Sequence, residues 1–138
     1  MPSRMNATFL LLVGLQALHS VEEYAAHFYE RFPPARALGH VFPGVPRPGF
    51  VGLNVALFVF GVWCYFARVR HRTASAAMWA WVWVAIEMFN GVAHPVWAVS
   101  VGGYAPGLIT APLLLVVALT LAWQLRRASS GGTPRFCN

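Results

Sequence analysis

Four ionisable side chains fall in a short stretch near the start of the chain, directly after an apolar run over residues 9–18: His19, Glu22, Glu23 and His27. On a helix, residues three, four and eight positions apart share one face. An ionisable side chain within a membrane-spanning helix is costly and usually faces the interior of a bundle. The pattern therefore indicates a functional site. The alternative, an interfacial helix end, fits less well because apolar and aromatic residues continue to Tyr29.

A second polar stripe occupies one face of a later expected helix: Glu87, Asn90 and His94. His19 lies thirteen residues after Asn6, and Glu87 lies thirteen residues after Ala74. At about 1.5 Å of rise per residue, both side chains reach a depth of about 20 Å from the same membrane face. Further polar residues are expected at this end of the bundle: Asn54, Tyr104 and Thr110. We therefore expect polar side chains from four helices to converge on one site in the outer half of the bundle.

The first hypothesis for this site is metal binding, since histidine and carboxylate groups suit zinc, iron or manganese. The predicted metal ligands are His19, Glu23, His27, Glu87 and His94. A bound divalent ion would offset the cost of burying carboxylates in a bilayer, and it could activate water for hydrolysis, or dioxygen if it is iron. The spacing differs from the Glu-x-x-His pairs of known di-metal helix bundles. We expect an enzyme that acts on a small lipophilic substrate.

The alternative chemistry is metal-free acid–base catalysis, in which a protonated glutamate donates to an alkene, epoxide or carbonyl of a lipid or terpenoid-like substrate. Such an enzyme would be an isomerase or a cyclase. The predicted catalytic residues are His19, Glu22, Glu23, Glu87, Asn90 and His94. The predicted substrate-binding residues are Asn54, Trp83, Tyr104 and Thr110. A third hypothesis is not enzymatic: a proton-coupled carrier, or a structural bundle whose helices are joined by buried polar contacts.

The composition is that of an integral membrane protein. Of the 138 residues, 58% are hydrophobic and 10% are charged, which is far from the balance of a soluble domain. The net charge of +6 comes from arginines in loops and at helix ends, so it favours a membrane topology signal over nucleic-acid binding. The expected partners are the lipid bilayer, a lipophilic substrate and a second copy of the chain. We do not expect Cys64 to form a disulfide with Cys137.

The expected fold class is all-α, a polytopic membrane four-helix bundle over residues 1–127. The predicted spans cover residues 6–29, 50–67, 74–100 and 107–125, each close to the length that a bilayer requires. The stretch 30–49 holds five prolines and three glycines, so we predict a loop there. Residues 128–138 are rich in small and polar residues and predict a flexible C-terminal tail.

The distribution of arginine predicts the orientation. With four spans, one side of the membrane would carry the two termini and the turn after the second span, with seven arginines, and the other side would carry three. Loops with an excess of arginine and lysine stay in the cytoplasm. Both termini are therefore predicted to be cytoplasmic.

Three sequence elements resemble the HXXEE domain family of small bacterial integral membrane proteins. His19-Ser20-Val21-Glu22-Glu23 matches its signature, Asn90 to His94 resembles its asparagine–histidine element, and Tyr104 to Thr110 resembles its Tyr-x-Pro-Gly-x-x-Thr turn. The resemblance covers most of the chain. It implies an enzyme-like site in the inner membrane of a bacterium, and it names no substrate.

Overall fold

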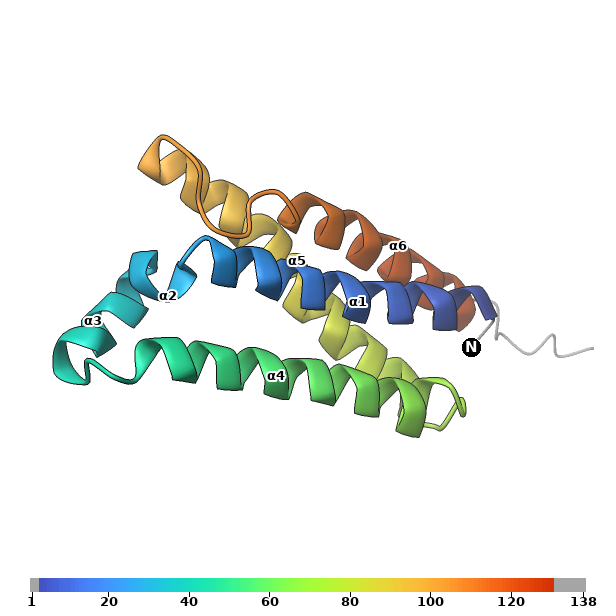
Figure 1. The fold of residues 1–138 in the computed structure, drawn as a ribbon. Helices are drawn as coiled ribbons and strands as arrows, with labels where there is room; N and C mark the ends of the chain where they lie inside the picture. The colour runs from blue at the N-terminus through green and yellow to red at the C-terminus, as the bar shows by residue number, and fades with distance from the viewer. Residues whose placement is uncertain (1–2, 131–138) are drawn as a thin grey trace, which may run out of the picture.

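The computed structural model describes residues 3–130, and every regular element in this range is helical (Figure 1). The long helices are α1 (Ser3–Ala25), α4 (Pro46–Cys64), α5 (Ala76–Val101) and α6 (Ala111–Ser130). The short helices α2 (Phe28–Arg31) and α3 (Pro33–Val41) connect α1 to α4, and α4 continues into the π-helical turn η1 (Tyr65–Val69). The expected all-α class is confirmed for the described residues.

Three segments are long and apolar enough to cross a membrane: Pro46–Val69, Ala76–Val101 and Ala111–Ser130. The first long helix, α1, has a comparable length of 23 residues. It falls outside this group because Gln16, His19 and the two glutamates of the HXXEE motif lower its mean hydropathy. The polar residues that mark the site are thus also those that weaken the membrane signal of α1.

The helices alternate in direction along the bundle. Helix α6 packs against α5 and α1, and α4 runs along the other side of α1 (Figure 1). Near the ends of α1 and α6, Gln124 Nε2 donates to Thr8 Oγ1 at 3.1 Å. The start of α1, the end of α6 and the turn between η1 and α5 lie at one end of the bundle, and α2 and α3 lie at the other (Figure 1).

The apolar core fills the half of the bundle that contains the start of α1. Its centre is Trp83, which is fully buried and packs edge-on against Phe9 with ring centroids 6.1 Å apart. On α4, a Cβ at Gly61 would lie 2.6 Å from the Trp83 ring, so glycine allows α4 to approach α5 there. This core holds the helices in register, so that polar residues nearer the α2–α3 end meet.

The predicted loop over residues 30–49 is wrong, because this stretch forms the end of α2, all of α3 and the first turn of α4. Pro43 lies in the turn between α3 and α4, and the other prolines are compatible with helix because they fall in first turns. Pro33 and Pro34 open α3, and Pro46 and Pro48 lie in the first turn of α4. At these positions the missing N–H has no helical partner to lose, and the fixed φ of proline favours the helix.

Other boundaries differ by a few residues from those expected. Helix α1 ends at Ala25 rather than at residue 29, because His27 takes a left-handed conformation with φ of 57°. Helix α6 begins at Ala111 and continues to Ser130, so residues 128–130 of the expected tail are helical. The rest of that tail, including Arg135 and Cys137, lies outside the described residues, and Cys64 is buried.

Candidate functional site

Two histidines and one glutamate form a compact, buried cluster between α1 and α5. His19 Nε2 lies 3.2 Å from His94 Nε2. Glu23 Oε1 lies 3.7 Å from His19 Nε2 and 3.4 Å from His94 Nε2. The i, i+4 spacing places His19 and Glu23 on one face of α1, and α5 supplies His94. We refer to these three residues as the triad.

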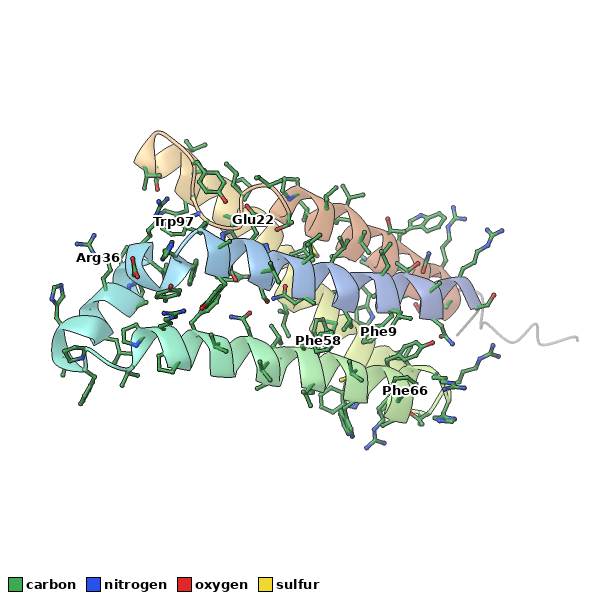
Figure 2. All side chains as sticks on the ribbon, viewed as in Figure 1. Phe9, Glu22, Arg36, Phe58, Phe66 and Trp97 are labelled. Atoms are coloured by element: carbon green, nitrogen blue, oxygen red, sulfur yellow. The ribbon has the colours of Figure 1, made fainter. Side chains whose placement is uncertain are left out.

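The neighbouring glutamate, Glu22, fixes a turn above the triad. Its carboxylate accepts hydrogen bonds from Tyr104 Oη at 2.8 Å and from the backbone N–H groups of Ile109 and Thr110 at 3.0 and 2.9 Å. It also accepts from Thr110 Oγ1 at 2.6 Å. Figure 2 shows Glu22 on α1 beside the segment that leads into α6. This carboxylate therefore ties the segment before α6 to α1.

These contacts decide which nitrogen of His19 carries the proton. Thr110 Oγ1 gives its only hydrogen to Glu22, so it accepts from His19 Nδ1, which lies 2.7 Å away. His19 is then protonated at Nδ1, and its Nε2 presents a lone pair to the other members of the triad.

The same logic applies to His94. Its Nδ1 lies 2.6 Å from the carbonyl oxygen of Pro106, which can only accept. His94 therefore carries its proton on Nδ1 and presents the lone pair of Nε2 toward His19 and Glu23. Two imidazole lone pairs and a carboxylate oxygen converge on one point, which is the donor set of a cation site.

A glycine lets the turn close over both imidazoles. Gly107 has φ of +87°, and a Cβ there would lie 2.6 Å from His19 Cε1 and 2.7 Å from His94 Nδ1. Any other residue would be strained in this conformation and would displace the histidines. The Pro-Gly pair of the turn thus supplies both the carbonyl that orients His94 and the space that the rings need.

Tyr104, which also lies in this turn, stays a hydrogen-bond donor. Burial and the hydrogen bond to the Glu22 carboxylate raise the pKa of Tyr104 to about 12. Its hydroxyl is therefore protonated at neutral pH and donates to Glu22.

A second polar cluster lies on the same side of α1 and α5. Glu87 is fully buried, and Asn90 Nδ2 donates to its Oε2 at 3.3 Å. With its nitrogen turned toward this carboxylate, the side-chain amide of Gln16 donates to Glu87 Oε2 at 2.8 Å. Ser20 Oγ lies 3.3 Å from the same amide and donates to Asn54 Oδ1 on α4 at 2.6 Å. Polar side chains from α1, α4, α5 and the turn before α6 thus form two clusters, where the sequence predicts one site.

Two predicted site residues lie elsewhere. The side chain of His27 is 56% exposed and lies beside Tyr29 and Glu30, because α1 ends before the turn that would have carried it to the triad. Trp83, predicted to bind substrate, belongs to the apolar core. Glu87, also predicted as a metal ligand, is in the second cluster rather than the triad.

An aromatic cover over the triad is a feature that sequence reasoning missed. The ring centroids of Phe28 and Trp97 lie 6.0 and 6.4 Å from that of His94, and Phe28 also packs against Phe50 at 5.6 Å. Trp97 is labelled in Figure 2, close to the α2 end of the bundle. The spacing of Trp97 three residues after His94 was a usable signal, whereas Phe28 reaches the site only because α2 turns back. The hydrogen bond from Ser20 Oγ to Asn54 Oδ1 is another contact that sequence reasoning missed.

Comparison with known proteins agrees with the three sequence elements. A family model described as "Protein of unknown function with HXXEE motif" matches residues 10–122, so the predicted family is confirmed. Comparisons with curated proteins and with solved structures found no match.

Proposed function

The chain belongs to the HXXEE family, and from its geometry we propose that it is an integral membrane enzyme whose triad binds a divalent metal ion. The bound metal assists hydrolysis or oxidation of a small lipophilic substrate. The observation that carries this proposal is the convergence of three acceptor atoms from His19, Glu23 and His94, with both imidazole protons directed away from the centre.

The separations of these atoms suit a tetrahedral ion. A zinc ion with bonds of about 2.0–2.1 Å to its ligands holds them about 3.3 Å apart. The ligand atoms of the triad are separated by 3.2, 3.4 and 3.7 Å. Two histidines and one carboxylate leave a coordination position for water or substrate, as in catalytic zinc sites. The same ligand types bind iron(II) in oxygenases.

Each neighbouring residue has a role in this site. Thr110 and the Pro106 carbonyl hold the imidazoles in the ligating tautomer, and Glu22 holds Thr110. Phe28 and Trp97 exclude water on the side of His94. A bound metal supplies an activated water or a Lewis acid.

We also propose that α1 is a fourth span and that both termini are cytoplasmic, in the inner membrane of a bacterium. In support, α1 packs alongside α6, and both termini of the described chain lie at the end that also holds Arg68, Arg70 and Arg72 (Figure 1). The opposite end carries Arg31, Arg36 and Arg47. Adding the arginines near the termini makes the first end the richer in positive charge.

Metal analysis tests the proposal. Protein purified in detergent without chelators is analysed by elemental mass spectrometry, with His19→Ala and, as a matched control, His27→Ala. We expect near-stoichiometric zinc, iron or manganese in the wild type and in His27→Ala, and its loss in His19→Ala. A wild-type protein without metal, or a His19→Ala protein that keeps it, would refute metal binding by the triad.

One observation favours a second candidate, a metal-free isomerase or cyclase. Glu87 is fully buried, and its side-chain partners in the described structure are the neutral amides of Gln16 and Asn90. Such a carboxyl group suits proton transfer to an apolar substrate. In this case the protein would turn over substrate without metal, and Glu87→Gln would abolish activity while the fold is retained. A metal requirement with full activity of Glu87→Gln would exclude this candidate.

A further inference from the structure

We propose that the α2–α3 end of the bundle contains a binding site for an amphiphile with an anionic head group. The site consists of three adjoining cavities whose linings share residues. That this amphiphile is the substrate of the enzyme rests on the function proposed above, whereas its binding does not.

The first cavity is the most polar of the three, and two arginines and one glutamate line it. It has a volume of about 370 Å³, and its charged and titratable lining residues are Tyr29, Glu30, Arg36, His40 and Arg47. The Glu30 carboxylate lies 3.6 Å from His27 Nδ1. The Arg36 guanidinium makes no hydrogen bond or ion pair with other described residues and is open to a ligand. A carboxylate or phosphate is the complementary group for two arginines, which present a planar set of donors.

Arg47 is held in position at the edge of this cavity. Its Nε donates to Tyr24 Oη at 3.2 Å, and its guanidinium carbon lies 5.5 Å from the centroid of the Tyr24 ring. Tyr24 in turn lines the groove between α1 and α4. The positive charge is therefore fixed where the polar cavity meets the apolar surface.

The second and third cavities are apolar. The second, of about 280 Å³, lies between α3 and α4 and shares Tyr29, Ala35 and Pro46 with the first. The third, a groove of about 440 Å³ between α1 and α4, shares Phe50 with the second and is lined by Val21, Val55 and Phe58. Figure 2 shows Arg36 on α3 and Phe58 farther along α4. Volumes of this size are typical of ligand sites, and their order fits a charged head followed by an apolar chain.

The middle cavity borders the triad. Phe28 lines it, and the same ring lies 6.0 Å from the His94 ring, centroid to centroid. An amphiphile whose head group binds Arg36 and Arg47 therefore places the first part of its chain beside the aromatic cover of the triad. This arrangement names the substrate class: a fatty carboxylate or a phosphorylated lipid, in either case an anionic head on an apolar chain.

Native mass spectrometry in neutral detergent tests the site with four probes: dodecyl phosphate, dodecanoate, dodecylphosphocholine and inorganic phosphate. We expect the wild type to bind one or both anionic amphiphiles in preference to the zwitterionic probe and to inorganic phosphate. Which of the two binds more tightly identifies the head group. The Arg36→Gln/Arg47→Gln double variant is expected to lose about tenfold or more in affinity, because charge-assisted hydrogen bonds are lost. The matched control is Arg70→Gln/Arg72→Gln at the opposite end of α4, which should bind as the wild type does.

A second pair of variants tests the apolar cavities. A Cβ at Gly49 has Val45 Cγ1 as its nearest neighbour at 3.8 Å, so Gly49→Leu is tolerated and fills the middle cavity. Its control is Gly52→Leu, on the same helix with open space around it. We expect Gly49→Leu to weaken binding of dodecyl phosphate and dodecanoate, and Gly52→Leu to leave it unchanged. Unchanged binding of the anionic amphiphiles in both the double arginine variant and Gly49→Leu would overturn the site. An affinity of the wild type for dodecylphosphocholine or inorganic phosphate equal to its affinity for the anionic amphiphiles would also overturn it.

The same measurement on His19→Ala separates the two proposals. Binding of the anionic amphiphile should persist in this variant while the metal is lost. A wild-type protein that binds the amphiphile but holds no metal would refute the proposed metal chemistry alone. A protein that holds metal but does not bind either anionic amphiphile would refute this site alone.

Discussion

Glu22 acts on the triad through Thr110. A carboxylate that accepts from the Thr110 hydroxyl leaves the threonine oxygen to accept from His19 Nδ1. The second glutamate of the HXXEE motif lies in the triad, whereas the first orients a histidine of that triad. The paired glutamates are therefore not equivalent, although they are adjacent and both acidic.

Replacement of Glu22 tests this difference. In Glu22→Gln, an amide N–H₂ group would replace one acceptor oxygen opposite the N–H groups of Ile109 and Thr110. We expect the affinity for metal to fall about 10- to 100-fold, as for other residues that orient a metal ligand. Competition with a fluorescent chelator measures this, and the exposed Glu30→Gln is the control. Equal affinity of Glu22→Gln and wild type would show that Glu22 has no such role.

Gly107 allows a second test at the scale of one residue. The methyl group of Gly107→Ala would overlap His19 and His94 and would strain a positive φ. We expect a loss of about 1–3 kcal/mol of stability, seen as a lower thermal midpoint, together with weaker metal binding. The control is Gly103→Ala, whose Cβ meets no atom within 4 Å. A Gly107→Ala protein with wild-type stability would mean that the turn does not close tightly over the rings.

At the scale of elements, close approach of α5 and α6 positions His94 relative to the turn. A Cβ at Gly91, one turn before His94, would lie 2.6 Å from Leu115 Cβ on α6. We expect Gly91→Val to separate these helices and to cost about 1–3 kcal/mol through overpacking, with Gly52→Val as the matched control. Thermal unfolding in detergent measures both. Equal midpoints would show that the two helices are not in tight contact at Gly91.

The sequence predicted elements better than their ends. Apolar length located the helices that could span a membrane, and i, i+4 spacing placed His19 and Glu23 on one face. The end of α1 at Ala25 depends on a single left-handed residue, His27, which helical periodicity cannot detect. The number of prolines in residues 30–49 predicts a loop, but the effect of each proline depends on whether it falls in the first turn of a helix. The orientation of His94 depends on a backbone carbonyl, that of Pro106, which no pattern of side chains encodes.

At the scale of the whole molecule, the proposed topology places the α2–α3 end outside the cytoplasm. Single cysteines at His40 and at Arg70, in a Cys137→Ser background, test it in intact cells. We expect His40→Cys to react with a membrane-impermeant maleimide and Arg70→Cys to react only after the cells are opened. Cys64 is buried, so we expect it to contribute little background labelling by the maleimide. The reverse pattern would invert the orientation, and labelling of both in intact cells would contradict a membrane crossing by the segment Pro46–Val69.

The partners of His19 lie far along the chain, with 75 residues separating it from His94 and 91 from Thr110. During synthesis, α1 leaves the ribosome before any residue that can orient His19 or complete the triad exists. The polar face of α1 can form these contacts only after the turn before α6 has been synthesised, because Glu22 accepts a hydrogen bond from Thr110 in that turn. Helix α1 is thus synthesised before α5 and α6, and it reaches its final place only when both are present.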